Sequence, residues 1–173
     1  MTDNFPKIIQ EVLEKHIEKI NQNNIWAESI FQPIKHDSTT GKGDFGQNLL
    51  VELLKEIGIP AEVVNGGIGD YDIYLPTYNL KIEAKFATQD TNKRFQFNAF
   101  DKTKDYDLAM VVGCTPTGLY FDFIEKSEIQ KLTTSQTKAD GGFKMNRGLN
   151  NMKPLTAANF QQESQQKLWV KAA

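Results

Sequence analysis

The chain has 173 residues, of which 39% are hydrophobic and 24% charged, a composition typical of globular rather than disordered proteins. This length predicts one domain, residues 1–173, with a substantial core. No apolar run reaches the roughly 18 residues of a membrane span, so no membrane partner is expected. Acidic residues in the N-terminal segment argue against a secretory signal. Cys114 is the only cysteine, which excludes an internal disulfide and indicates a reducing, cytoplasmic setting.

The net charge of −2 is unevenly distributed. From Lys126 onward, eight lysines and arginines face three acidic residues, a net charge of +5, while the first 125 residues carry −7. A basic C-terminal region on an acidic body is compatible with a surface that binds a polyanion, although ordinary solvated faces show similar imbalances.

Hydrophobic spacing predicts helices at both ends of the chain and one before the central strands. Phe5–Asn21 is expected to be an amphipathic helix, because its apolar residues recur at helical spacing. A second helix, about Asp44–Ile57, is ended by a glycine and a proline. Lys126–Leu132 is expected to be a short helix, and Pro154–Val170 a closing one.

Strands are expected between these helices. The predicted strands are Glu62–Val64, Asp72–Leu75, Leu80–Phe86, Leu108–Val112 and Leu119–Ile124. Gly66, Gly67 and Gly69 interrupt the chain after the first of them. Thr88–Asp105 is expected to be helix-compatible or irregular, and Thr133–Met152 a loop. The order of elements predicts a mixed α/β fold, with a central mixed sheet flanked by helices.

The stretch YDIYLPTYNLKIEAK predicts a hairpin that brings acidic residues together. If Pro76–Asn79 forms the turn, Leu75 pairs with Leu80, and the same register places Asp72 directly across from Glu83. Opposed side chains lie on one face with Cβ atoms ~5 Å apart, where like charges are destabilising. The register also places Asp70 opposite Lys85, where a salt bridge is expected.

Two converging carboxylates form a site for a hard cation such as Mg²⁺. Lys85 projects to the same side as Glu83, where it can orient a water molecule or stabilise charge on a phosphate. This combination suits metal-assisted phosphodiester hydrolysis. A half-buried strand whose charged residues simply contact solvent shows the same alternation, so that interpretation stays open.

The hairpin resembles the core motif of the PD-(D/E)xK nuclease superfamily, which includes most type II restriction endonucleases. The matching residues are Asp72 and the Glu83-Ala84-Lys85 element, and the surrounding order of helices and strands, residues 40 to 125, agrees. The resemblance implies a restriction-endonuclease-like core. It also implies that Asp72, Glu83 and the Ala84 carbonyl bind Mg²⁺, and that Lys85 positions or activates the attacking hydroxide. The implied products carry a 5′-phosphate and a 3′-hydroxyl.

The sequence departs from the superfamily pattern at one helical position. Many relatives carry a glutamate on the first core helix, often just after a glycine, whereas here Gln47 follows Gly46 and Glu52 points away from it. Gln47 is an auxiliary candidate that would hydrogen-bond a metal-bound water, and one or two Mg²⁺ ions are compatible with the pattern. Asp70 is an auxiliary candidate for the position of Asp72.

Candidate DNA contacts lie in two segments. Asn92–Lys104 mixes cations and amides with three phenylalanines that we expect in the core, and it contributes Lys93, Arg94, Gln96 and Asn98. The glycine-rich loop Lys138–Lys153 contributes Lys144, Asn146 and Arg147. Cations suit phosphates, and amides suit adenine edges. An ordinary solvated strand or loop is the alternative for each segment.

Other motifs are incomplete. TTGKGD lacks the early glycine and the serine or threonine of a phosphate-binding loop, and GGIGD lacks the context of a dinucleotide fold, so no nucleotide cofactor is expected. Two histidines, His16 and His36, support neither a zinc cluster nor a serine triad.

The resemblance implies a Mg²⁺-dependent endodeoxyribonuclease acting on double-stranded DNA, of the type II restriction kind found in restriction-modification systems. Residues 1–40 would form an N-terminal helix and connection, 41–125 the catalytic core, and 126–173 a basic C-terminal region. Cutting both strands implies a homodimer. Two alternatives stay open: a repair or junction-resolving nuclease, and a non-catalytic nucleic-acid-binding domain on a nuclease scaffold.

Overall fold

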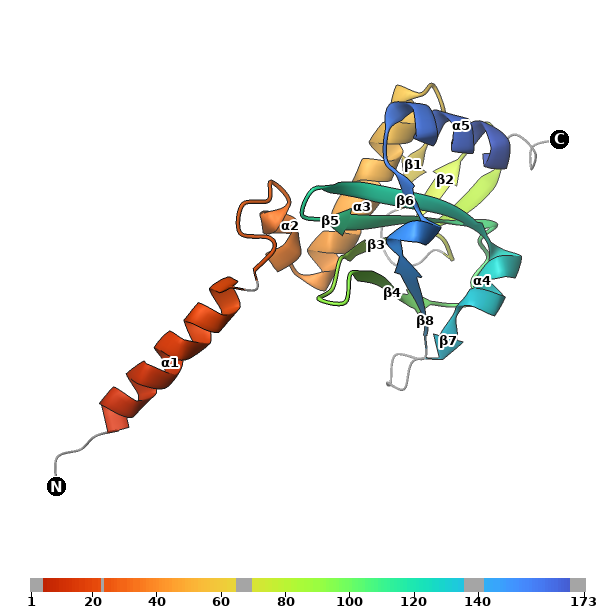
Figure 1. Cartoon of the computed structure of the whole chain (residues 1–173). Helices are drawn as coiled ribbons and strands as arrows, with labels where there is room; N and C mark the ends of the chain where they lie inside the picture. Colours follow the sequence, from red (N-terminus) through yellow and green to blue (C-terminus); the bar gives the residue numbers. More distant parts are fainter. Residues whose placement is uncertain (1–4, 23, 65–69, 136–141, 169–173) are drawn as a thin grey trace.

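The computed structural model describes residues 5–22, 24–64, 70–135 and 142–168 (Figure 1). The expected glycine break at Gly66, Gly67 and Gly69 lies outside these residues, as does the start of the loop Lys138–Lys153. The helices are α1 (Phe5–Gln22), α2 (Gln32–His36), α3 (Thr39–Glu56), α4 (Lys126–Leu132), the 3₁₀ turn η1 (Leu149–Asn151) and α5 (Ala157–Leu168). The strands are β1 (Glu62–Val63), β2 (Ile73–Leu75), β3 (Leu80–Thr88), β4 (Arg94–Phe100), β5 (Leu108–Thr115), β6 (Gly118–Glu125), β7 (Thr134–Ser135), β8 (Phe143–Gly148) and β9 (Lys153–Pro154).

The described strands form two sheets. The larger sheet has the order β1-β2-β3-β5-β6-β9, in which β3 and β5 run parallel and the other neighbours antiparallel. The smaller sheet has the order β4-β8-β7. Helices α3 and α5 lie along one side of the large sheet, and the small sheet and α4 lie along the other (Figure 1). The predicted mixed α/β fold with a helix-flanked central sheet is confirmed.

Two apolar clusters hold these layers together. The first joins the large sheet to α3 and α5 through residues such as Leu50, Leu54 and Phe160. The second lies between the two sheets and includes Phe95, Phe97 and Phe100. Strand β5 is buried along its whole length, because side chains on both of its faces enter one of these clusters. Its continuously apolar sequence is typical of such a central strand.

The segment Thr88–Asp105 was expected to be helix-compatible or irregular, and this is wrong, because it contains strand β4. Phe95, Phe97 and Phe100 are all buried, as expected, but their spacing is not a strict alternation. The register between β4 and β8 shifts between Phe97 and Phe100, and Ala99 in that interval has a φ of 56°. Because of this irregularity, Phe100 points inward like Phe95 and Phe97, although three residues rather than two separate it from Phe97. The sequence therefore lacks the regular alternation that identifies a strand.

The interval Thr133–Met152 was expected to be a loop, and this is also wrong. Its described part contains β7, β8 and η1, and β8 pairs with β4, which is far away in the sequence. Helix α3 begins at Thr39, earlier than the predicted Asp44. The preceding Ser38 caps this helix, because its hydroxyl accepts a hydrogen bond from the backbone N–H of Gly41 at 2.9 Å.

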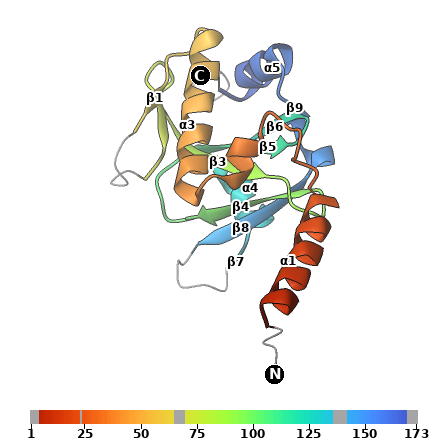
Figure 2. The same cartoon turned by 90° about the vertical axis from the view of Figure 1, so that its left-hand side faces the viewer.

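Helix α1 stands apart from the two sheets in both views (Figures 1 and 2). Residues 7 to 18 are exposed, including the apolar side chains of Ile9, Val12, Leu13 and Ile17. Among the described residues, no helix has the length and apolar character needed to cross a membrane.

Candidate active site

The alternation of strand β3 separates a core face from a polar face. Leu80, Ile82 and Ala84 are buried in the cluster beneath α3. Glu83 and Lys85 therefore point to the opposite side of the large sheet, the side on which the small sheet packs. The predicted assignment of the two faces is confirmed.

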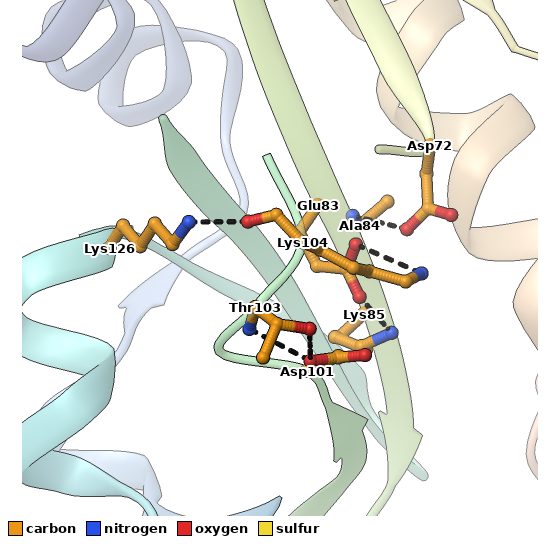
Figure 3. Close-up of polar contacts among 8 residues, drawn as sticks. All are labelled: Asp72, Glu83, Ala84, Lys85, Asp101, Thr103, Lys104 and Lys126. Carbon is orange, nitrogen blue, oxygen red and sulfur yellow. Dashed lines mark hydrogen bonds and ion pairs between the residues drawn. The ribbon is translucent and has the colours of Figure 1, made fainter. Parts of the chain in front are cut away.

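The predicted hairpin register is also confirmed, and it places Asp72 beside the same strand. Leu75 pairs with Leu80 and Ile73 with Ile82, and regular pairing ends there, one residue after Asp72. The Asp72 side chain then takes the place of a backbone partner, because its Oδ2 accepts a hydrogen bond from the N–H of Ala84 at 2.8 Å (Figure 3).

Glu83 is completely buried, although its carboxylate is charged and polar. Within the described chain, neither of its oxygens has a hydrogen-bond donor of normal geometry. Two ammonium groups approach instead: Lys85 Nζ lies 2.5 Å from Oε1, and Lys104 Nζ lies 3.9 Å from Oε2 (Figure 3). Burying a charged carboxylate with so few partners costs desolvation free energy, and an additional positive charge nearby would offset that cost.

The pKa of Glu83 is raised above its ordinary value. Burial is the main cause, because it disfavours the charged form, and the neighbouring Asp72 charge adds to it. Lys85 and Lys104 oppose this shift without cancelling it. The charge of Asp72 therefore contributes to the raised pKa of Glu83, after burial.

Lys85 lies between a charged and an aromatic partner. Its ammonium is 5.7 Å from the centre of the Phe100 ring, in addition to its contact with Glu83. Only 19% of its side chain is exposed. The expected salt bridge between Lys85 and Asp70 is wrong: Lys85 pairs with Glu83, and Asp70 lies in an exposed bend before β2.

The donor set fits a hard cation. Glu83 offers two buried oxygens whose close partners are ammonium groups, Asp72 adds a carboxylate, and the Ala84 carbonyl is the third candidate ligand. Mg²⁺ commonly takes only one or two carboxylates and keeps several waters. In the described part of the chain, no three histidine, cysteine, aspartate or glutamate side chains gather as a metal cluster. Waters and substrate oxygens would have to complete the coordination.

The auxiliary candidate Gln47 lies on α3 next to its closest approach to β3. The preceding Gly46 is buried, and a Cβ built there would lie 2.6 Å from Cβ of Phe86, the residue after Lys85. Gln47 itself is half-buried. Glu52 is 73% exposed and pairs with Lys55 at 3.0 Å, which confirms that it points away from the site.

Most of the candidate DNA contacts gather on the outward face of the small sheet. Gln96 on β4 pairs in register with Asn146 on β8, and both are exposed. Gln96 Nε2 also donates to Asn98 Oδ1 at 2.9 Å. Arg94 is exposed on the same face of β4, and Lys144 lies two residues before Asn146 on β8. Lys93 is exposed in the adjoining turn, with a φ of 59°.

Arg147 is oriented differently from these residues. Its Nη2 donates to Asp122 on β6 and, at 3.0 Å, to the carbonyl of Asn151. Burial lowers the pKa of its guanidinium. The side chain thus connects the small sheet to the large one and is not part of the outward face of the small sheet.

The surface also has two hollows, one lined in part by Asn48 and Pro60 and another by Asp122 and Arg147. Neither hollow includes Asp72, Glu83 or Lys85.

Lys104 is the site residue that the nuclease motif does not contain. In the sequence, its segment Asn92–Lys104 is distinguished only by a mixture of cations, amides and aromatics. The contact with Glu83 depends on how residues 101 to 107 cross the large sheet, which no local spacing reveals.

Comparisons with known proteins give distant likenesses among solved structures alone. No family model matches the chain, and no curated protein matches it. Among solved structures, the chain is similar to a bacterial homing endonuclease, I-Ssp6803I, with 15% sequence identity and a TM-score of 0.48. The alignment covers 78% of this chain and 96% of that chain. The likeness is one of fold, and we base the function on the site's own residues.

Proposed function

We propose that this protein is a Mg²⁺-dependent endodeoxyribonuclease that hydrolyses phosphodiester bonds in double-stranded DNA, as a type II restriction endonuclease does. The observation that carries the proposal is the fully buried Glu83 carboxylate, whose close partners are ammonium groups and which lies beside Asp72 and Lys85. Burying a carboxylate is costly even when an ammonium group lies beside it. Its retention next to a second carboxylate and an amine fits a site that binds a cation and a phosphate.

Each residue has a role in this proposal. Asp72, Glu83 and the Ala84 carbonyl would hold one or two Mg²⁺ ions, which would polarise the phosphate and lower the pKa of a bound water. Lys85 donates hydrogen bonds that orient the attacking oxygen and offset the growing negative charge. The new bond forms between this oxygen and phosphorus, and the bond from phosphorus to the 3′ oxygen breaks. A proton completes the 3′-hydroxyl, and the phosphate stays on the 5′ end.

The outward face of the small sheet is the proposed DNA contact. It offers Arg94, Gln96, Asn98, Lys144 and Asn146, which include two cations and three amides and no carboxylate. Cations contact phosphates without regard to sequence, while amides read base edges. Lys93 in the adjoining turn would add a phosphate contact. The proposed enzyme acts as a homodimer, because a double-strand cut needs two active sites.

The test is incubation of unmodified plasmid DNA with the protein and Mg²⁺. Discrete bands are expected, and they should disappear in EDTA. The variants D72N and E83Q should reduce the cleavage rate by about 10³-fold or more, because each removes a ligand charge while keeping the side-chain shape. An E52Q variant, which changes an exposed glutamate on α3, should cleave like the wild type.

Two other results would replace the proposal. Cleavage confined to branched DNA would indicate a junction-resolving or repair nuclease. Binding of DNA without cleavage, equal in wild type and E83Q, would indicate a non-catalytic binding domain.

A further inference from the structure

Lys104 reaches Glu83 from a part of the chain outside the hairpin. Its Nζ lies 3.9 Å from Glu83 Oε2, whereas Lys85 Nζ lies 2.5 Å from Oε1 (Figure 3). The Lys104 side chain is 32% exposed and that of Lys85 is 19% exposed. Lys85 is therefore the close, enclosed partner of Glu83. Lys104 is a more distant partner whose side chain is partly exposed to solvent.

The backbone beneath Lys104 is held in place by its neighbours. Asp101 Oδ1 accepts hydrogen bonds from the N–H of Thr103 at 2.8 Å and from its hydroxyl at 2.6 Å. These two bonds lower the pKa of the Asp101 carboxyl. On the other side, the Lys126 ammonium donates to the carbonyl of Lys104 (Figure 3).

Further along the segment, residue 107 ties the chain to β3. The N–H of Lys81 donates to Asp107 Oδ2 at 2.9 Å, and the N–H of Asp107 donates to the carbonyl of Lys81 at 2.9 Å. The segment is thus anchored at both ends while the Lys104 side chain stays partly exposed. Because the backbone is already fixed, the Lys104 ammonium can contact a ligand with little loss of conformational entropy.

The charges of the site point to a ligand for this second lysine. The two acidic side chains, Asp72 and Glu83, and the two basic ones, Lys85 and Lys104, have formal charges that sum to zero. A divalent cation at the carboxylates would leave the site with two positive charges. A phosphodiester carries one negative charge, and hydroxide attack adds a second. The site with both lysines therefore matches the charge of the transition state rather than that of the substrate.

We propose that Lys104 is a second catalytic lysine, which leaves Glu83 when the cation binds and contacts the scissile phosphate of the substrate. This inference rests on the proposed function, and it adds a residue that the hairpin motif does not contain. Without Lys104, the loaded site would carry one positive charge fewer and would stabilise the doubly charged transition state less.

The test compares K104M with K102M. The methionine keeps an apolar stem and removes the charge. Lys102 belongs to the same segment, but its ammonium lies 3.7 Å from the centre of the Phe143 ring and donates to the Gln130 carbonyl, so it has a partner elsewhere. Two quantities are measured for each variant: the Mg²⁺ affinity of the DNA-free protein by calorimetry, and the cleavage rate at saturating Mg²⁺ and DNA.

The two quantities should move in opposite directions in K104M. Mg²⁺ affinity should rise about threefold to tenfold, because a cation that competes for Glu83 is gone. The cleavage rate should fall about 10²-fold, as when one charge-stabilising donor is removed. K104R should restore most of the rate, and K102M should match the wild type in both measurements.

Other outcomes would overturn the inference. A K104M variant that loses both Mg²⁺ affinity and activity, together with its thermal unfolding temperature, would show that Lys104 only holds the fold. A cleaving wild type with K104M equal to K102M would remove Lys104 from the mechanism and leave the nuclease proposal standing. A wild type that cleaves no DNA would end both proposals.

Discussion

Asp72 has a structural role that can be separated from its proposed chemical one. Its carboxylate accepts the hydrogen bond of the partly buried Ala84 N–H and also raises the pKa of Glu83. The D72N variant keeps an acceptor oxygen and removes the repulsion, while D72A leaves the N–H without its partner. We expect D72A to have a free energy of unfolding about 1 kcal/mol below that of D72N, measured by urea denaturation in EDTA. Equal values for the two variants would contradict the role of this hydrogen bond.

The thiol of Cys114 provides a pH prediction away from the site. Burial raises its pKa to about 12, against a smaller opposing effect of Lys35, and the side chain is fully buried in β5. From the ordinary thiol value of 9.0 up to about 12, the folded protein keeps a proton that the unfolded chain loses. The free energy of unfolding should therefore fall as pH rises through this window.

The control for this prediction is C114A, which lacks the thiol. Its free energy of unfolding should decline less between pH 9 and pH 11 than that of the wild type. Below pH 9 the thiol should also react with Ellman's reagent much more slowly in the folded protein than in urea. Rapid reaction of the folded protein would contradict the burial of Cys114.

At the level of elements, the sequence predicted the features that depend on residues close together in the chain. The register of β2 and β3 follows from a four-residue turn, so Asp72 and Glu83 could be placed together without a structure. Strand β8 could not be predicted in this way, because its partner β4 lies far away in the chain. The irregularity at Ala99 also breaks the period that would have identified β4. Lys104 was missed for the same reason, since tertiary packing alone brings it to Glu83.

The contact between α3 and β3 depends on Gly46. An added Cβ would lie 2.6 Å from Phe86 Cβ, and neither atom can move by rotating a side chain. The G46A variant should therefore lose about 1–3 kcal/mol of unfolding free energy in urea titrations, because the helix must shift away from the sheet.

Gly43 lies on the same helix with no atom within 4 Å of an added Cβ. G43A should be more stable than wild type by up to about 1 kcal/mol, since alanine favours helix. A destabilised G43A would show that helix propensity does not dominate there.

The outward face of the small sheet separates phosphate contacts from base contacts. R94A should weaken binding to all DNA sequences and reduce the dependence of affinity on salt by about one counterion. Q96A and N146A should instead relax sequence preference at one base pair, by about 1–3 kcal/mol, because their side chains face each other across β4 and β8. Fluorescence anisotropy over a salt series and a panel of duplexes would measure both effects. K55A, on the opposite side of the large sheet, is the control and should change neither.

For the whole molecule, the feature to explain is the apolar stripe of helix α1, which the other described elements leave exposed. Ile9, Val12, Leu13 and Ile17 are between 49% and 63% exposed, although their helical spacing is that of a buried stripe. The exposed ion pair between Lys7 and Glu11 lies on another face of α1. Helical residues that keep such a stripe exposed bury it in an assembly. The proposed double-strand cleavage favours a second copy of the chain as the occupant of this stripe.

We therefore expect the protein to be a dimer held together in part by α1, and L13E to dissociate it in light scattering coupled to gel filtration. Dissociation should leave Asp72, Glu83 and Lys85 in place, because Glu83 and Lys85 lie in β3 and Asp72 directly precedes β2, its partner strand. The L13E variant should then nick supercoiled plasmid while its double-strand cleavage falls about tenfold or more. K15E, on the polar face of the same helix, changes a charge without touching the stripe and should behave like the wild type. A wild type that is monomeric at micromolar concentration, or an L13E variant that stays dimeric, would assign the exposed stripe to something other than self-association. The nicking activity would still report on the active site itself.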